Sequence, residues 1–180
     1  MALKSSVYHF SIDLSDIDRE VYQSFKLSVA LHPSESLEFM ATRVLAYALE
    51  YGDGIAFSPG IGSPDEPTLY LKDLVGAYVA WIEIGSPDPE RLHRASKASP
   101  RVAVYCHRNP DTSLERLRGA QIFRGCDISM FSFADGFIDA LSKALDRRNE
   151  MTVSRSDQTV YVGINGLSLS SPVEDRKVNR

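Results

Sequence analysis

Three acidic residues, Asp65, Glu66 and Glu83, are spaced so that their carboxylates can act together. A predicted β-hairpin turns near Val75-Gly76, which places Glu83 on the outgoing strand opposite the start of the incoming strand. Asp73, close to the turn, falls about five residues or ~17 Å along the strand from Glu83. Carboxylates are hard oxygen donors suited to divalent cations. Hairpin geometry therefore favours Asp65 and Glu66 over Asp73 as partners of Glu83.

The elements that would position these residues follow from hydrophobic periodicity. Two alternating segments joined by the polar link 15–20 indicate an antiparallel ribbon. Turns are expected at Ser156-Asp157 and Asn165-Gly166, and the last eight residues are polar and expected to be frayed. The expected strands are 8–14, 25–31, 55–57, 68–72, 77–84, 101–107 and 127–133, with two or three more in 151–169; the expected helices are 33–51, 90–97, 111–121 and 137–147.

The first helix has a candidate start signal. Pro33 suits the first helical position, with His32 as the cap and Glu35 spaced to accept from the His32 backbone N–H. Glu38 follows on the flank of the apolar face of this helix. A strand and the Gly-, Ser- and Pro-rich loop 58–67 then lead into the hairpin.

Length and composition restrict the class of protein. The chain has 180 residues, a formal charge of −4 and 43% hydrophobic residues, as expected for one globular domain, 1–180, with its core at about 33–107. The two cysteines, Cys106 and Cys126, are far apart and indicate reduced thiols in a cytoplasmic protein. The longest apolar stretch, 74–82, is too short for a membrane span. Motifs for ATP, dinucleotides and zinc proteases are absent from the sequence.

The order helix, three-stranded meander, helix, parallel strand resembles the PD-(D/E)XK nuclease fold. The resemblance implies an α/β domain with a restriction-endonuclease-like mixed sheet and an αβββαβ core, plus an N-terminal β-ribbon and C-terminal strands. It also implies that Asp65, Glu66 and Glu83 hold Mg²⁺ or Mn²⁺, with Glu38 completing the site. The metal would activate water for attack on a phosphodiester.

The nuclease motif has a lysine two residues after its glutamate. Here that glutamate is Glu83, and the residue two positions later is Gly85. A cation from the next helix can compensate, and Arg91, Arg94 and Lys97 recur at three-residue spacing on one helical face. Arginine can bind phosphate with two parallel hydrogen bonds, whereas lysine can also transfer a proton. The segment 86–125 holds eight lysines and arginines against four acidic residues, so it could present a phosphate-binding face.

A closer resemblance is to the YaeQ family, small bacterial proteins of uncertain function. It covers the chain from the N-terminus to about residue 106, and the element order continues to match beyond. The resemblance implies a variant PD-(D/E)XK architecture in which Gly85 is a family trait, without an established activity. The matching residues are Ala2-Leu3-Lys4, His32-Pro33-Ser34-Glu35, Glu38, Met40, Arg43, Leu45-Ala46, Asp65-Glu66-Pro67, Lys72-Asp73-Leu74, Trp81-Ile82-Glu83-Ile84-Gly85, Pro87-Asp88, Arg91 and Arg94-Ala95-Ser96.

Each candidate residue also has a structural interpretation. Glu83 could pair with a nearby arginine, and Trp81, which shares its strand face, could simply pack in the core. Glu38 could pair with Thr42 or be solvated. The Cys106-His107 pair is a poor nucleophile and base, because adjacent strand residues point to opposite faces.

Three functional interpretations remain open. In the first, the protein is a metal-dependent phosphodiesterase in which Glu38, Asp65, Glu83, Arg94 and Lys97 act in catalysis and Arg91 helps to bind phosphate. In the second, the same fold is a non-catalytic module that contacts DNA, RNA or a nucleic-acid-processing partner. In the third, the acidic cluster is ordinary surface.

Overall fold

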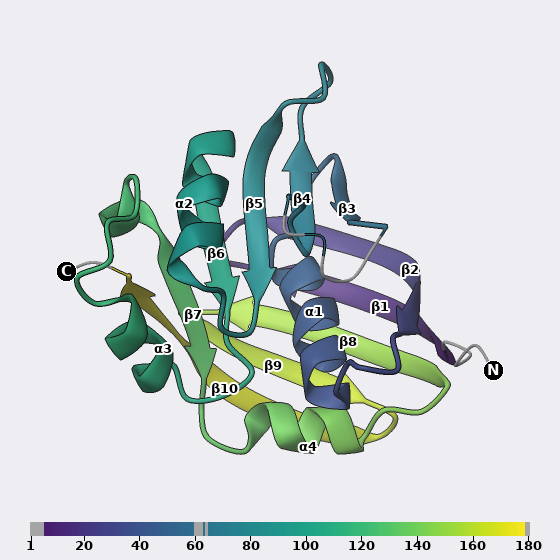
Figure 1. Ribbon diagram of the computed structural model, residues 1–180. Helices are drawn as coiled ribbons and strands as arrows, with labels where there is room; N and C mark the ends of the chain where they lie inside the picture. The colour runs from purple at the N-terminus through teal and green to yellow at the C-terminus, as the bar shows by residue number, and fades with distance from the viewer. Residues whose placement is uncertain (1–5, 60–62, 64, 179–180) are drawn as a thin grey trace. The chain divides into compact units, whose positions relative to one another are not determined.

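The computed structural model describes residues 6–59, 63 and 65–178 (Figure 1). Its contacts divide the chain into two compact units, each built from segments distant in sequence. The first unit comprises Met1–Leu49 and Phe133–Val173, and the second comprises Glu50–Ser132 and Glu174–Arg180. Within the described part of the chain, no helix has the length and apolar character needed to cross a membrane.

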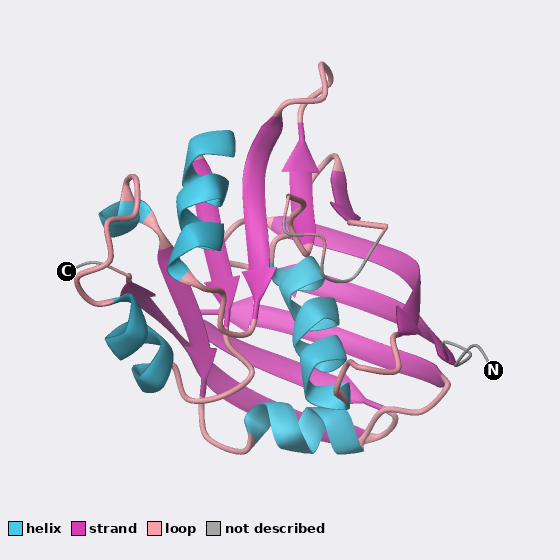
Figure 2. Cartoon of the chain, in the orientation of Figure 1, coloured by secondary structure: helices cyan, strands magenta, loops and turns pink. Residues whose placement is uncertain are grey.

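The first unit is a sheet covered by two helices (Figures 1 and 2). Its strands are ordered β2-β1-β8-β9-β10. Strands β1 and β8 are parallel, and the other neighbouring pairs are antiparallel. Its elements are β1 (Ser6–Asp16), β2 (Val21–Leu31), α1 (Leu37–Leu49), α4 (Phe137–Lys143), β8 (Arg148–Ser156), β9 (Thr159–Ile164) and the beginning of β10 (Leu167–Lys177).

Alternation along β1 separates the two faces of this sheet. Phe10, Ile12 and Leu14 are buried, whereas His9 and Asp13, which point to the opposite face, are exposed. Helices α1 and α4 contact each other, and α1 also contacts β8. The expected antiparallel ribbon and both C-terminal turns are confirmed.

The predicted start of the first helix is wrong. Helix α1 begins at Leu37, because Ser36 caps it by accepting from the Phe39 N–H at 3.1 Å. Glu35 does accept from the His32 N–H, at 3.1 Å, but this hydrogen bond closes a turn that precedes the helix. Pro33 lies in that turn.

The second unit is a mixed sheet with α2 against β5 and β6. Its strands are ordered from the end of β10 through β7, β6, β5 and β4 to β3. Buried apolar side chains, among them Trp81, Leu92, Val104 and Met130, form its core. The elements are β3 (Ile55–Phe57), β4 (Leu69–Lys72), β5 (Tyr78–Ile84), α2 (Pro89–Ala98), β6 (Arg101–Tyr105), α3 (Asp111–Leu117), the 3₁₀ turn η1 (Gly125–Asp127) and β7 (Ser129–Phe133).

The expected element order is observed as α1, β3, β4, β5, α2 and β6, and β5 and β6 are parallel as expected. Helix α1 belongs to the first unit and the other five elements to the second. The equivalence of these six elements to a restriction-endonuclease core stays a prediction, as does the single domain. The C-terminal prediction is wrong in part, because β10 continues to Lys177 and Val178 is buried.

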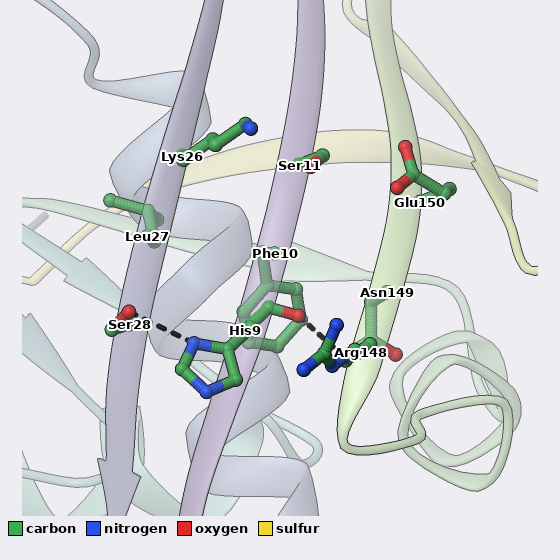
Figure 3. Close-up of a pocket in the computed structure, with 9 residues that line it drawn as sticks. All are labelled: His9, Phe10, Ser11, Lys26, Leu27, Ser28, Arg148, Asn149 and Glu150. Atoms are coloured by element: carbon green, nitrogen blue, oxygen red, sulfur yellow. Dashed lines mark hydrogen bonds between the residues drawn. The ribbon is translucent and has the colours of Figure 1, made fainter.

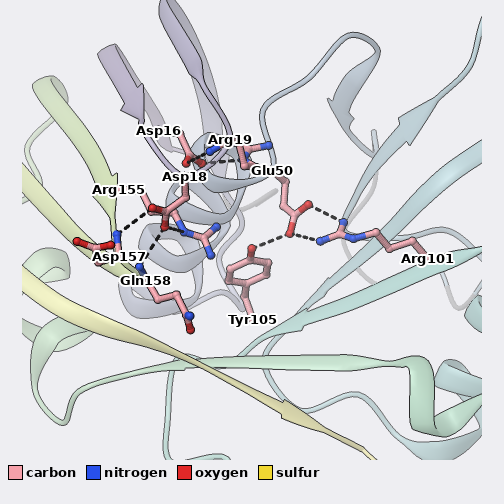
Figure 4. A network of polar contacts seen from close by, with 9 residues as sticks. All are labelled: Asp16, Asp18, Arg19, Glu50, Arg101, Tyr105, Arg155, Asp157 and Gln158. Atoms are coloured by element: carbon pink, nitrogen blue, oxygen red, sulfur yellow. Dashed lines mark hydrogen bonds and ion pairs between the residues drawn. The ribbon is translucent and has the colours of Figure 1, made fainter.

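Each unit contains a polar network (Figure 4). In the first unit, the carboxylate of Asp18 accepts from the backbone N–H groups of Asp157 and Gln158 at 2.8 and 3.0 Å. It thereby ties the β1–β2 turn to the β8–β9 turn. In the second unit, Glu50 accepts two hydrogen bonds from the Arg101 guanidinium, at 2.6 and 2.8 Å, and one from the Tyr105 hydroxyl at 2.7 Å.

Candidate functional site

The hairpin register predicted from the sequence is confirmed. Leu69 pairs with Ile82 across β4 and β5, so Thr68 lies opposite Glu83. The Thr68 hydroxyl donates to Oε2 of Glu83 at 3.1 Å. At the other end of the hairpin, Lys72 pairs with Tyr78, so Asp73 is distant from Glu83 along the strand. The loop that carries Asp65 and Glu66 therefore leads into the strand position beside Glu83.

The carboxylate of Glu83 is enclosed by protein donors. Its side chain is only 2% exposed. Oε1 accepts from Nε1 of Trp81 at 2.6 Å and from Nε of Arg91 at 2.8 Å, while Oε2 accepts from Thr68. Trp81 is itself in the core, which confirms the structural interpretation of that residue. Both oxygens of Glu83 thus have hydrogen-bonding partners within the second unit.

Arg91 joins Glu83 to the preceding loop. Its Nη1 donates to the carbonyl of Ser63 at 2.9 Å and its Nη2 to the carbonyl of Glu66 at 2.7 Å. The start of α2 orients this side chain, because Asp88 caps the helix by accepting from the Arg91 backbone N–H at 2.7 Å. The structural interpretation of Glu83, a pair with a nearby arginine, is confirmed.

The electrostatics of Glu83 reflect its burial. Removal of the carboxylate from water raises the pKa of Glu83, and the hydrogen bond from Trp81 and the positive charge of Arg91 oppose this rise. A buried carboxylate without a compensating cation would be costly. The Trp81 hydrogen bond and the charge of Arg91 together keep a charge at this position tolerable.

Gly85 has a structural role of its own. Its φ of +90° lies in a region that residues with a Cβ rarely adopt, and its N–H donates to the Tyr105 carbonyl at 2.8 Å. The residue ends β5 while continuing the hydrogen bonding with β6. A lysine at this position would strain the backbone, so the departure from the nuclease motif has a conformational basis.

The other predicted acidic ligands are placed differently. Asp65 is exposed and Glu66 is half-buried, and the contact between Glu66 and Arg91 uses the backbone carbonyl. Glu38 is half-buried in α1 of the first unit, and Thr42 donates to its backbone carbonyl instead of its carboxylate. Among residues 6–59, 63 and 65–178, no three His, Cys, Asp or Glu side chains cluster as a metal site would require.

In this arrangement Oε1 of Glu83 does not fit the role of a Mg²⁺ ligand. Such an ion requires carboxylate oxygens at about 2.1 Å in near-octahedral geometry. Oε1 already accepts a buried hydrogen bond from Trp81 and a charge-assisted one from Arg91, and the Arg91 guanidinium occupies the space beside it. A divalent cation at Oε1 would have to displace that guanidinium.

The three cations of α2 separate into two groups. Arg91 lies at the flank of the helix and points to Glu83, whereas Arg94 and Lys97 lie on the side opposite the buried Leu92, Ala95 and Ser96. Arg94 forms a partly exposed ion pair with Glu90 at 3.2 Å, and Lys97 is exposed. Only Arg94 and Lys97 are therefore placed to meet a ligand from solvent.

Sequence reasoning missed the Glu50–Arg101–Tyr105 network. Its members are 51 and 55 residues apart in the chain, and none shows a local motif. Burial raises the pKa of Cys106 to about 12, which disfavours the thiolate that a nucleophile requires.

The fold and this site define a mixed α/β protein with a buried carboxylate–guanidinium pair at the start of a strand–helix connection. The family model described as "YaeQ protein" matches residues 1–172. The chain therefore belongs to the YaeQ family, as its sequence resemblance implied.

Comparisons with individual proteins of known sequence or structure point to the same family. The uncharacterized protein YaeQ of Escherichia coli (strain K12) is 34% identical over 172 residues, and that of Salmonella typhi is 28% identical over 171 residues; each match covers 90% of both chains. The crystal structure of YaeQ from Pseudomonas syringae matches with a TM-score of 0.84 at 29% identity, covering 95% of both chains. That from Xanthomonas axonopodis pv. citri matches with a TM-score of 0.82 at 25% identity, covering 97% of this chain and 99% of that one.

Proposed function

We propose that this member of the YaeQ family is a non-catalytic binding module that contacts the phosphates of nucleic acid through the exposed side of α2. The observation that carries the proposal is the closure of Glu83 by Arg91, Trp81 and Thr68. The carboxylate that hydrolysis would need is thereby engaged in hydrogen bonds within the protein. The closure leaves a helix whose outward cations are available to a ligand.

Charge supports the binding part of the proposal. Lys97 is exposed, and the Arg94–Glu90 pair is a partly exposed ion pair of a kind that contributes little stability and can be exchanged for a phosphate. Arg108 and Arg118 in the same basic segment are also exposed. Phosphate contacts of this kind give affinity that falls with salt and depends little on sequence.

The test is fluorescence anisotropy with labelled single-stranded DNA, double-stranded DNA and RNA of mixed sequence, at low salt and over a salt series. The parent should bind at least one of them. The Arg94→Ala/Lys97→Ala variant should lose affinity, and the salt slope should fall by about one for each phosphate contact removed. Lys97→Ala should weaken binding more than its control Lys143→Ala, which removes an exposed lysine from the first unit. Absence of affinity in the parent would contradict the proposal.

Metal-dependent phosphodiester hydrolysis is a second candidate, and one observation favours it. Arg91 links Glu83 to the backbone of Glu66, so the acidic loop lies near the buried carboxylate. Conversion of supercoiled plasmid in Mg²⁺ or Mn²⁺ by the parent, lost in Glu83→Gln, would establish this candidate. No conversion is expected if the binding-module proposal is correct.

A further inference from the structure

A polar pocket of about 450 Å³ opens on the first unit, on the sheet formed by β2, β1 and β8 (Figure 3). This volume is within the range of small-molecule sites. Strand register aligns two rows of side chains across the three strands. The first row is Ser28, His9 and Arg148, and the second row is Lys26, Ser11 and Glu150.

The pocket rests on a well-fixed base. Phe10, between His9 and Ser11 in sequence, points to the opposite face and is buried in the core. Asn149, between Arg148 and Glu150, is buried and donates to the His9 carbonyl at 3.1 Å and to the Asp146 carbonyl at 2.6 Å. The polar side chains of the two rows therefore project from strands whose relative positions are set by core packing and hydrogen bonds.

The charged groups of the pocket are not used by the fold. Nδ1 of His9 is 3.0 Å from Oγ of Ser28, so the imidazole is oriented within its row. Among the residues that the structure describes, Lys26 and Arg148 have no carboxylate partner, and Glu150 has no cationic one. Three potential cations and one carboxylate face the same space, which is an arrangement for a ligand with both an anionic end and hydroxyl groups.

We propose that this pocket binds a hydroxyl-bearing organic phosphate. The Arg148 guanidinium can hold two phosphate oxygens in parallel hydrogen bonds, and His9, Ser28 and Lys26 supply further donors. Glu150 accepts hydrogen bonds from ligand hydroxyls two residues further along β8. This site is independent of the nucleic-acid contacts proposed for α2, which belongs to the second unit.

The test is a calorimetric titration with ribose 5-phosphate, inorganic phosphate and ribose as separate probes, with amide chemical shifts to locate binding on β1, β2 and β8. Ribose 5-phosphate should bind more tightly than inorganic phosphate, and ribose should not bind. Arg148→Gln should weaken ribose 5-phosphate by about tenfold, the loss of a charge-assisted hydrogen-bond pair. The control Arg147→Gln changes an adjacent exposed arginine that does not line the pocket and should leave affinity unchanged.

A second variant distinguishes the hydroxyl contact from the phosphate contact. Glu150→Gln should weaken ribose 5-phosphate without weakening inorganic phosphate, because it removes the strong hydroxyl acceptor and a like charge. Equal affinity for the two probes, equal losses in Arg148→Gln and Arg147→Gln, or no binding at millimolar concentration would overturn the proposal. The Arg94→Ala/Lys97→Ala variant should retain ribose 5-phosphate binding, so failure of the α2 proposal is recognised separately.

Discussion

Nε of Arg91 lies 2.8 Å from Oε1 of Glu83, and the same guanidinium holds the carbonyls of Ser63 and Glu66. One side chain therefore neutralises a buried carboxylate and secures the loop before β4. In a nuclease-like arrangement this carboxylate would face a metal. Here it is part of the interior of the second unit.

Removal of Arg91 should be strongly destabilising. Arg91→Met leaves Glu83 buried without its cation and should lower the free energy of unfolding by about 3 kcal/mol or more. Glu83→Gln keeps the shape of the side chain and an oxygen that accepts from Trp81. It should therefore lower the free energy of unfolding less than Arg91→Met does. Urea denaturation measures both, with Arg94→Met as the control, since its exposed pair should contribute no more than about 1 kcal/mol. Equal losses in Arg91→Met and Arg94→Met would show that the buried pair is not important for the fold.

The cost of Arg91→Met should depend on pH. Without Arg91, only the hydrogen bonds from Trp81 and Thr68 oppose burial, so the pKa of Glu83 should rise further above its ordinary value of 4.5. The folded variant then binds more protons than the unfolded chain above pH 4.5, and its stability falls as pH increases. The difference in unfolding free energy between parent and variant should be larger at pH 8 than at pH 5. A difference that is independent of pH would mean that Glu83 is not charged in the parent.

Restoring the motif lysine should not restore a nuclease. Gly85→Lys places a Cβ at a φ of +90° and should cost about 1 to 3 kcal/mol of stability. Since Arg91 still forms an ion pair with Glu83 in this variant, plasmid incubated with the variant and Mg²⁺ should stay supercoiled. Cleavage by a folded Gly85→Lys protein would show that the glycine alone had silenced a hydrolase.

The two thiols should differ in reactivity. Cys126 is exposed, whereas burial raises the pKa of Cys106 to about 12. Ellman's reagent at pH 8 should therefore titrate one thiol in the native protein and two in denaturant. Because the folded Cys106 holds its proton over a range where the unfolded thiol does not, its contribution to stability should be lost as pH rises from about 9 to 12. Rapid reaction of both native thiols would contradict the burial of Cys106.

The parts of the fold predicted from sequence were those set by neighbouring residues. Alternation and turn residues located β4 and β5, and their register placed Glu83 beside the end of the acidic loop. The sequence shows the three-residue spacing of the α2 cations. The inward orientation of Arg91, however, depends on how α2 is rotated about its own axis relative to β5. Periodicity does not encode that rotation.

Long-range pairings were beyond local reasoning. His9 reaches Arg148 only because β1 and β8 pair in parallel across more than a hundred residues, so the pocket of the first unit had no sequence signal. The start of α1 was mispredicted because Pro33 was placed at the first helical position, whereas the His32–Glu35 hydrogen bond closes a turn before the helix and Ser36 caps the helix itself.

Calorimetric titration of Mn²⁺ into the parent and into Glu83→Gln tests whether Glu83 belongs to an ion pair and not to a metal site. The two proteins should give the same heats, with no binding that depends on Glu83 up to millimolar metal. A binding isotherm in the parent that disappears in a folded Glu83→Gln variant would contradict this expectation and make the metal-dependent phosphodiesterase the leading candidate.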